Sequence, residues 1–357
     1  MAQDTPPSPT PASLVLGGGV GLGAFQAGVF EVLAATPEID IRSISGASIG
    51  ALNGAIIVGN APQDRITKLR AFWDMVAVEA APSPWFDPWG LGDGTSFRLA
   101  RNWINAVTTG LVGSPGLFGP RAVLGGRGES RSLYDNGVVA DTLRSVIDFD
   151  RLNNGAIRFC VAATDVEAGE PVFFDTAEQH RIGPEHLIAS SSLLPAFEPI
   201  RVGDRLLGDG GLACNLPLEA EIGPNRTSPP EPLCLAIDLF TPEGTQPFHL
   251  NRTVERSLDL MFGMQTRMRL AGLQREWALD AALAQAKQGT ASPGADLLYV
   301  SYRSGATEAG FGKPFDLSRA TLADRWEAGQ GAATRALATW HGLGPDRAPG
   351  LRVHKVD

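Results

Sequence analysis

Few features of secreted, metal-binding or membrane-spanning proteins occur in this sequence. Its three cysteines, Cys160, Cys214 and Cys234, are widely spaced and form no C-x-x-C pair for a metal or a redox disulfide. No apolar run approaches the roughly 20 residues that a transmembrane helix needs. The N-terminal stretch lacks both the positive region and the apolar region of a secretory signal. We therefore expect a cytoplasmic protein without a metal or organic cofactor, and any membrane or micelle contact is expected to be peripheral.

Positive charge is also scarce. The chain has 30 Lys and Arg residues against 39 Asp and Glu residues, which gives a formal net charge of -9. This charge opposes binding to nucleic acid and to strongly anionic membrane surfaces, and no nucleic-acid-binding motif is present. A neutral or zwitterionic ester is compatible with it, so lipid and small esters stay open as substrates.

The composition predicts a globular protein of one large domain. Hydrophobic residues make up 43% of the 357 residues, enough for a sizeable core. Residues 1–12 are rich in proline and polar residues and are expected to form a disordered tail. Residues 13–345 are expected to form a single α/β domain.

Short apolar runs alternate with helical patterns along the chain. Strands are expected at 13–16, 41–45, 157–163, 233–239 and 297–302, a hairpin at 199–208, and helices at 134–147 and 317–337. The helical stretch 251–287 is expected to form two helices or one bent helix. Strands that alternate with helices in this way predict a three-layer α/β sandwich, with a central, mostly parallel sheet flanked by helices.

The segment 82–130 differs from its surroundings because it is rich in Pro, Gly and Trp. Its pattern predicts an irregular insertion, and a long apolar insertion is usually functional. Two interpretations stay open: an ordered loop packed on the core, or a mobile lid that contacts lipid.

The strongest local motif is Gly46-x-Ser48-x-Gly50, which lies between a predicted strand and a predicted helix. Such an elbow holds a serine nucleophile in a strained backbone conformation, and the flanking glycines prevent clashes. The start of the following helix is partly positive and favours an oxyanion. Close helix packing is the alternative explanation of these small residues.

Gly17, Gly18 and Gly19 follow the first predicted strand. Their N–H groups have no side chains between them and a reacting oxygen, as an oxyanion hole requires. The run Gly19-x-Gly21-x-x-Ala24 also fits the dinucleotide-binding pattern, but the acidic residue expected at the end of the second strand is missing, where Ser45 and Gly46 stand.

Asp209 is followed by Gly210 and Gly211 after the predicted hairpin. This triplet is typical of a simple turn. Flanking glycines also let a carboxylate approach another loop, where it can orient and deprotonate a serine hydroxyl.

Together these elements resemble the patatin-like phospholipase family, which has a glycine-rich loop, an early G-x-S-x-G elbow and a distant D-G-G/A. The segment 189–195, with sequence ASSSLLP, is similar to the A-S-x-x-x-P segment of that family. The resemblance implies a lipolytic serine hydrolase that works through an acyl-enzyme, with Ser48 as nucleophile, Asp209 as general base and Gly17 to Gly19 as oxyanion hole. Leu22 departs from the family, which usually carries Arg or Lys in this loop.

Alternatives to this assignment stay open from the sequence. His249, His341 and His354 follow Asp209, so a Ser-His-Asp esterase has an allowed order of residues. A lipid-binding protein without turnover could retain the same fold, and an acyltransferase would share the first half-reaction. Leu22 leaves neutral lipids and small esters as possible as phospholipids.

Overall fold

The computed structural model describes residues 8–78, 95–121, 131–224, 229–287, 294–305, 310–344 and 349–356. Within this part, a nine-stranded sheet has the order β11-β10-β9-β1-β2-β5-β8-β7, and β6 pairs with β5. Its strands are β1 Thr10–Leu16, β2 Ile39–Ala47, β5 Arg158–Asp165, β6 Glu170–Asp175, β7 Ile200–Val202, β8 Arg205–Asp209, β9 Leu233–Asp238, β10 Ala295–Ser301 and β11 Leu351–Val356. A two-stranded sheet pairs β3 Gly119–Pro120 with β4 Tyr134–Asp135.

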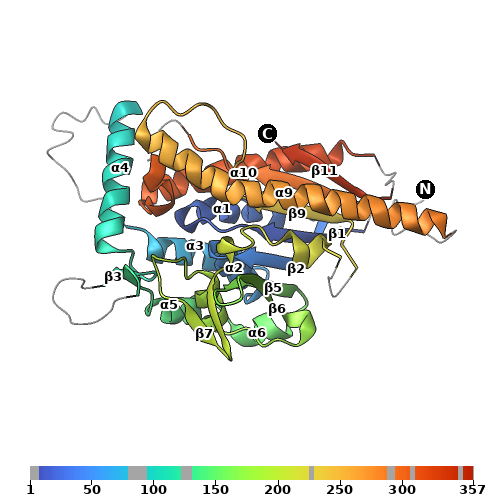
Figure 1. Ribbon diagram of the computed structural model, residues 1–357, viewed down its shortest axis with the longest axis horizontal. Coiled ribbons are helices and arrows are strands. Elements are labelled where there is room, and N and C mark those ends of the chain that lie inside the picture. The colour runs from blue at the N-terminus through green and yellow to red at the C-terminus, as the bar shows by residue number, and fades with distance from the viewer. Residues whose placement is uncertain are drawn as a thin grey trace.

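Helices cover both faces of the large sheet (Figure 1). They are α1 Gly23–Ala34, α2 Ile49–Val58, α3 Arg65–Val76, α4 Thr95–Val112, α5 Val139–Val146, α6 Phe149–Asn154, α7 Pro184–Ser190, α8 Leu218–Ile222, α9 Leu250–Ala286 and α10 Arg319–His341. Four 3-10 helices join them: η1 Val20–Leu22, η2 Thr176–Glu178, η3 Gly210–Leu212 and η4 Gly310–Phe315. None of the helices in the described residues combines the length and the apolar character needed to span a bilayer.

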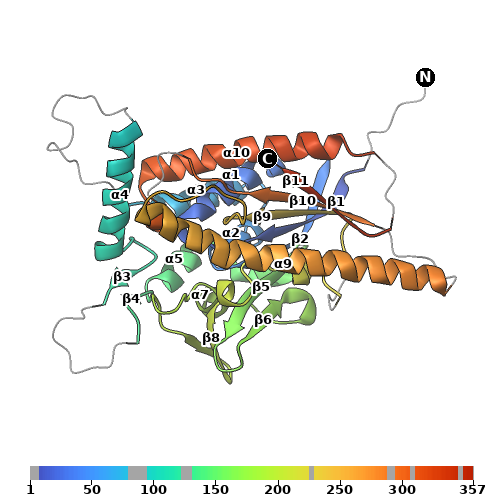
Figure 2. The same ribbon diagram turned by 45° about the horizontal axis from the view of Figure 1, so that its top comes forward.

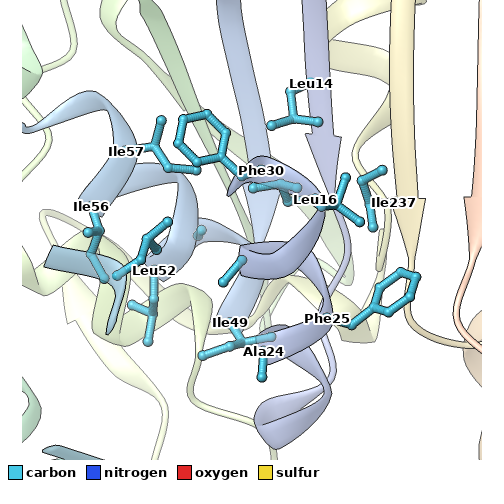
Figure 3. Close-up of a cluster of buried hydrophobic side chains, with 14 of the residues drawn as sticks. Leu14, Leu16, Ala24, Phe25, Phe30, Ile49, Leu52, Ile56, Ile57 and Ile237 are labelled. Carbon is cyan, nitrogen blue, oxygen red and sulfur yellow. The ribbon is translucent and has the colours of Figure 1, made fainter. Parts of the chain in front are cut away.

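Alternate residues of the central strands point into different cores. Leu14 and Leu16 of β1 pack with α1 and α2, in the cluster that Figure 3 shows. Val15 points to the other face and packs with Leu273 and Trp277 of α9. The strands from β11 to β5 pair in parallel, whereas β6, β7 and β8 are antiparallel. The expected three-layer α/β fold with a mostly parallel sheet is confirmed.

Several boundaries differ from the sequence expectation. The strand β1 begins at Thr10, inside the expected tail, because Thr10 to Ala12 pair with the start of β2. The edge strand β11 lies beyond residue 345 and pairs with β10. The segment expected as a helix at 134–147 is helical only in α5, because residues 134–135 pair with β3.

The segments 82–130 and 251–287 also differ from what the sequence predicts. The insertion is not irregular throughout, since its proline-free part forms the 18-residue helix α4; residues 82–94 and 122–130 lie outside the described residues. The helix α9 is one element of 37 residues. Gly263 lets it approach the loop after β9, because a Cβ there would lie 2.9 Å from the nitrogen of Pro242.

Candidate active site

Ser48 occupies a sharp turn between β2 and α2. Its φ of 53° and ψ of -128° place a non-glycine residue in a strained conformation. A Cβ at Gly46 would lie 2.6 Å from the nitrogen of Ala51, and one at Gly50 would lie 2.2 Å from the carbonyl oxygen of Leu16. Both glycines are therefore required by packing, and the turn has the geometry of a nucleophile elbow.

Strand register brings Asp209 to the level of Ser48. Ala47 pairs with Ala162 of β5, and Asp209 pairs with the next residue, Ala163, on the other side of β5. Gly210 then lies against the middle of β5, where a Cβ would lie 2.4 Å from the carbonyl oxygen of Ala162. The two residues that lie 161 positions apart in the sequence thus meet at one edge of the sheet.

The Asp209 carboxylate is buried, with 3% of the residue exposed. The N–H of Gly211 donates to its Oδ1 at 2.7 Å, and the Ser48 hydroxyl lies close enough to act on the carboxylate as a hydrogen-bond donor. Burial raises the pKa of Asp209 to about 7, although both hydrogen bonds lower it. A carboxylate with a pKa near neutrality accepts a proton more readily than an ordinary aspartate does.

The last residue of α7 and the turn after this helix hold both residues in place. The N–H of Ser48 donates to Ser190 Oγ at 3.0 Å, and Ser190 Oγ donates to the carbonyl of Ala162 at 2.6 Å. The N–H of Asp209 donates to the carbonyl of Ser192 at 3.0 Å. The sequence of this segment does not indicate this role, because these bonds join residues far apart in the chain.

The glycine loop after β1 lies against the elbow, but its N–H groups are not equivalent. Gly17 donates to the carbonyl of Ile237 and Gly18 to the carbonyl of Asn215, each at 3.1 Å. Among the described residues, the N–H of Gly19 has no acceptor. Of the three glycines expected as oxyanion donors, Gly19 alone thus has a free N–H within the described part of the chain. Gly18 provides space, since a Cβ there would lie 3.0 Å from Ser48 Cβ.

Asn215 and Gln265 were not found from the sequence. Asn215 receives the Gly18 N–H, and its own N–H donates to Gln265 Oε1 at 3.1 Å. Gln265 Nε2 donates to the carbonyl of Gly211 at 3.1 Å. The helix α9 thereby links the glycine loop to the turn that carries Asp209.

A narrow cavity of about 50 Å³ opens beside Ser48. Its walls are mostly apolar and come from several loops: Val20, Ile49, Leu52, Leu117, Phe118, Asn136, Val139, Ser191, Phe197 and Phe315. Leu117 and Phe118 belong to the described part of the insertion. Leu22 is fully buried in the main hydrophobic core, so the usual loop cation is replaced by a packed apolar side chain.

A family model described as patatin-like phospholipase matches residues 14–222, more than half of the chain. The chain belongs to the patatin-like phospholipase family. Membership makes it a carboxylic ester hydrolase of the esterase or phospholipase type. No sequence among curated proteins matches it.

Solved structures resemble this patatin-like chain over much of its length. VipD from Legionella pneumophila is 14% identical with a TM-score of 0.41, and the match covers 93% of this chain and 67% of VipD. A chain in the complex of SpcU with ExoU from Pseudomonas aeruginosa is 16% identical with a TM-score of 0.27. That match covers 74% of this chain and only 53% of the other.

The competing motifs have structural explanations in this patatin-like fold. Among the described residues, no hydrogen bond joins a histidine to Ser48 or Asp209, and His354 Nε2 instead lies 2.9 Å from Asp296 Oδ1. Gly21 of the dinucleotide-like pattern packs against η4, where a Cβ would lie 2.8 Å from the carbonyl oxygen of Pro314. Close packing thus accounts for this glycine without a nucleotide.

Proposed function

We propose that this patatin-like protein hydrolyses lipid esters through a Ser48-Asp209 dyad and an acyl-enzyme. The observation that carries the proposal is the buried Asp209 carboxylate beside the Ser48 hydroxyl, at the same level of the sheet and with its pKa raised to about 7. A serine hydroxyl is a weak nucleophile until a neighbouring base takes its proton. We assign that task to Asp209.

In the first half-reaction Ser48 Oγ forms a bond to the ester carbonyl carbon, and its proton passes to Asp209. The tetrahedral intermediate then expels the alcohol, which takes the proton from Asp209, and the acyl group stays on Ser48. In the second half-reaction water attacks the acyl carbon while Asp209 accepts its proton. Collapse releases the fatty acid and returns the proton to Ser48.

Two features support an oxyanion site beside Ser48. The N–H of Gly19 has no acceptor among the described residues, and the first N–H groups of α2 begin directly after Ser48. Free N–H groups and the partly positive start of a helix stabilise negative charge on oxygen. We assign the developing oxyanion to these donors.

The apolar walls of the cavity favour an acyl chain over a polar group in the space next to Ser48. Aliphatic and aromatic side chains line it, with Asn136 and Ser191 as polar members. Buried Leu22 and the net charge of -9 favour neutral or zwitterionic esters. We therefore propose medium-chain to long-chain lipid esters, phospholipids included, as substrates.

The test combines covalent labelling with turnover. The unmutated protein should react with a fluorophosphonate probe and hydrolyse p-nitrophenyl esters, and Ser48→Ala should abolish both. Mass spectrometry should place the label on the peptide that contains Ser48. Labelling elsewhere, or full turnover by Ser48→Ala, would refute the assignment of the nucleophile.

A further inference from the structure

Large apolar side chains are exposed at one end of the molecule. On α4, Leu111 is 70% exposed and Val112 is 68% exposed. At the start of α9, Phe248 is 79% exposed and Leu250 is 80% exposed. Other exposed apolar residues of the same helices or of nearby loops are Trp103, Leu133, Val138, Leu212, Val254 and Met261. Clustered exposure of this kind marks an interaction surface, whereas single exposed apolar residues are ordinary.

The helices that carry these side chains lie at the end of the fold where the parallel strands have their carboxyl ends and where Ser48 lies. Both α4 and α9 pack against η4, and Phe315 of η4 lines the cavity beside Ser48. Figures 1 and 2 show α4 across the end of the fold with the beginning of α9 beside it. Val138 and Leu212 directly adjoin Val139 of the cavity wall and Gly211 of the Asp209 turn.

We infer that this surface, formed by α4, the start of α9 and the loops beside them, docks the protein on a zwitterionic or neutral lipid surface. The inference rests on the proposed function, since a lipid ester must leave an assembly of lipids to reach Ser48. An apolar rim that inserts among acyl chains would place the cavity entrance at the substrate. Transfer of Phe and Leu side chains from water into an apolar phase is favourable.

Charge argues for the same kind of lipid. A net charge of -9 repels strongly anionic bilayers over a distance of about one Debye length, roughly 8 Å at physiological salt. Apolar insertion is not subject to this repulsion when the headgroups carry no net charge. Phosphatidylcholine vesicles are therefore the matching probe.

The far half of α9 offers a matched control. Leu279 and Leu283 are 69% and 52% exposed on the same helix, but they lie toward the opposite end of the sheet. Leu279 follows Leu250 by 29 residues, about 43 Å along the helix at 1.5 Å per residue. The double substitutions Phe248→Gln with Leu250→Gln and Leu279→Gln with Leu283→Gln thus remove similar apolar side chains from different ends of the fold.

The experiment measures co-flotation with phosphatidylcholine vesicles, with each variant built on Ser48→Ala so that turnover does not alter the lipid. The protein with only Ser48→Ala should float with the vesicles. The Phe248→Gln and Leu250→Gln variant should bind at least about tenfold more weakly, the change expected when one buried apolar side chain is lost. The Leu279→Gln and Leu283→Gln variant should bind unchanged, and thermal unfolding should show both variants folded.

Three outcomes would overturn the inference. They are absence of vesicle binding, equal losses in the two double variants, and a self-association that the Phe248→Gln and Leu250→Gln variant disrupts in place of vesicle binding. The last outcome would make a second copy of the chain the occupant of this surface. Vesicle binding and ester hydrolysis test the two proposals separately. If the protein floats with vesicles but never hydrolyses an ester, the docking surface is supported and the proposed function is refuted.

Discussion

The N–H of Ser48 donates to the hydroxyl oxygen of Ser190 at 3.0 Å, and this bond joins the strained elbow to the end of α7 and the turn that follows it. Ser190 is completely buried, and its hydroxyl donates a hydrogen bond to the carbonyl of Ala162 on β5. The same turn receives the N–H of Asp209 through the carbonyl of Ser192. Ser190 is therefore a positioning residue, since it acts on the reacting groups only through Ser48.

Ser190→Ala should lower kcat by at least about tenfold with little change in KM. The substitution removes the acceptor of the buried Ser48 N–H, and a buried polar group without a partner costs about 1–3 kcal/mol. Without the bond to Ser190, Ser48 would leave its strained conformation and bind the transition state less well. A loss of 1.4 kcal/mol in transition-state binding lowers the rate about tenfold. Steady-state kinetics with a p-nitrophenyl ester, together with thermal unfolding, measure both effects.

Ser192→Ala is the control for this prediction. Ser192 is equally buried in the same turn, and its hydroxyl donates to the carbonyl of Ile188 at 2.8 Å. Its backbone carbonyl, which holds Asp209, is unaffected by the change. We expect Ser192→Ala to lose stability and keep most of its kcat; equal losses of kcat in the two variants would show that Ser190 supports only the fold.

Activity should rise with pH through about 7. Asp209 must be ionised to accept the proton of Ser48, and burial raises its pKa to about 7. The value of kcat/KM should therefore fall about tenfold for each pH unit below this point and level off above it, because it reports the ionisation of the free enzyme. An unshifted aspartate would place the inflection near pH 4.

A histidine base would produce a similar inflection, so substitutions must separate the two. His249→Gln, His341→Gln and His354→Gln should each retain the inflection and most of the activity, because among the described residues none of these side chains is hydrogen bonded to Ser48 or Asp209. Asp209→Asn should abolish activity at every pH. A folded histidine variant without activity would contradict the dyad.

Asp209→Asn should stabilise the protein at pH 8. Because the folded pKa of about 7 exceeds the ordinary aspartate pKa of 3.8, the folded state holds the Asp209 proton to higher pH than the unfolded state does. The stability contribution of this group is thus fully present below pH 3.8 and is lost as pH rises to about 7. The loss is up to about 4 kcal/mol, at 1.36 kcal/mol per pKa unit.

Comparison of Tm for Asp209→Asn and the unmutated protein at pH 5 and pH 8 checks this prediction. The advantage of Asp209→Asn should be larger at pH 8, where the buried carboxylate is charged. Asp204→Asn serves as control, since Asp204 is exposed in the turn of the same hairpin. An advantage that is equal at both pH values would mean that the ionisation of Asp209 carries no cost to the fold.

The sequence predicts those parts of the site that depend on residues close together in the chain. Gly46 and Gly50 identify the elbow because they lie two residues from Ser48, and the glycines after Asp209 mark its turn. The oxyanion donors could not be sorted in this way, because the carbonyls that engage Gly17 and Gly18 belong to residues about 200 positions downstream. Ser190 was missed for the same reason, since it meets Ser48 across 142 residues.

A substitution of Gln265 tests whether this residue affects the ionisation of Asp209, which a purely structural residue would not do. It accepts a hydrogen bond from the N–H of Asn215 and donates one to the carbonyl of Gly211, next to Asp209. Gln265→Glu keeps the acceptor but adds a negative charge near Asp209, and a like charge raises the pKa of a carboxyl group. The inflection of kcat/KM should therefore move to higher pH. The control Gln274→Glu places the same charge on an exposed position of α9 and should leave the inflection unchanged, and an unmoved inflection in both variants would remove Gln265 from the active site.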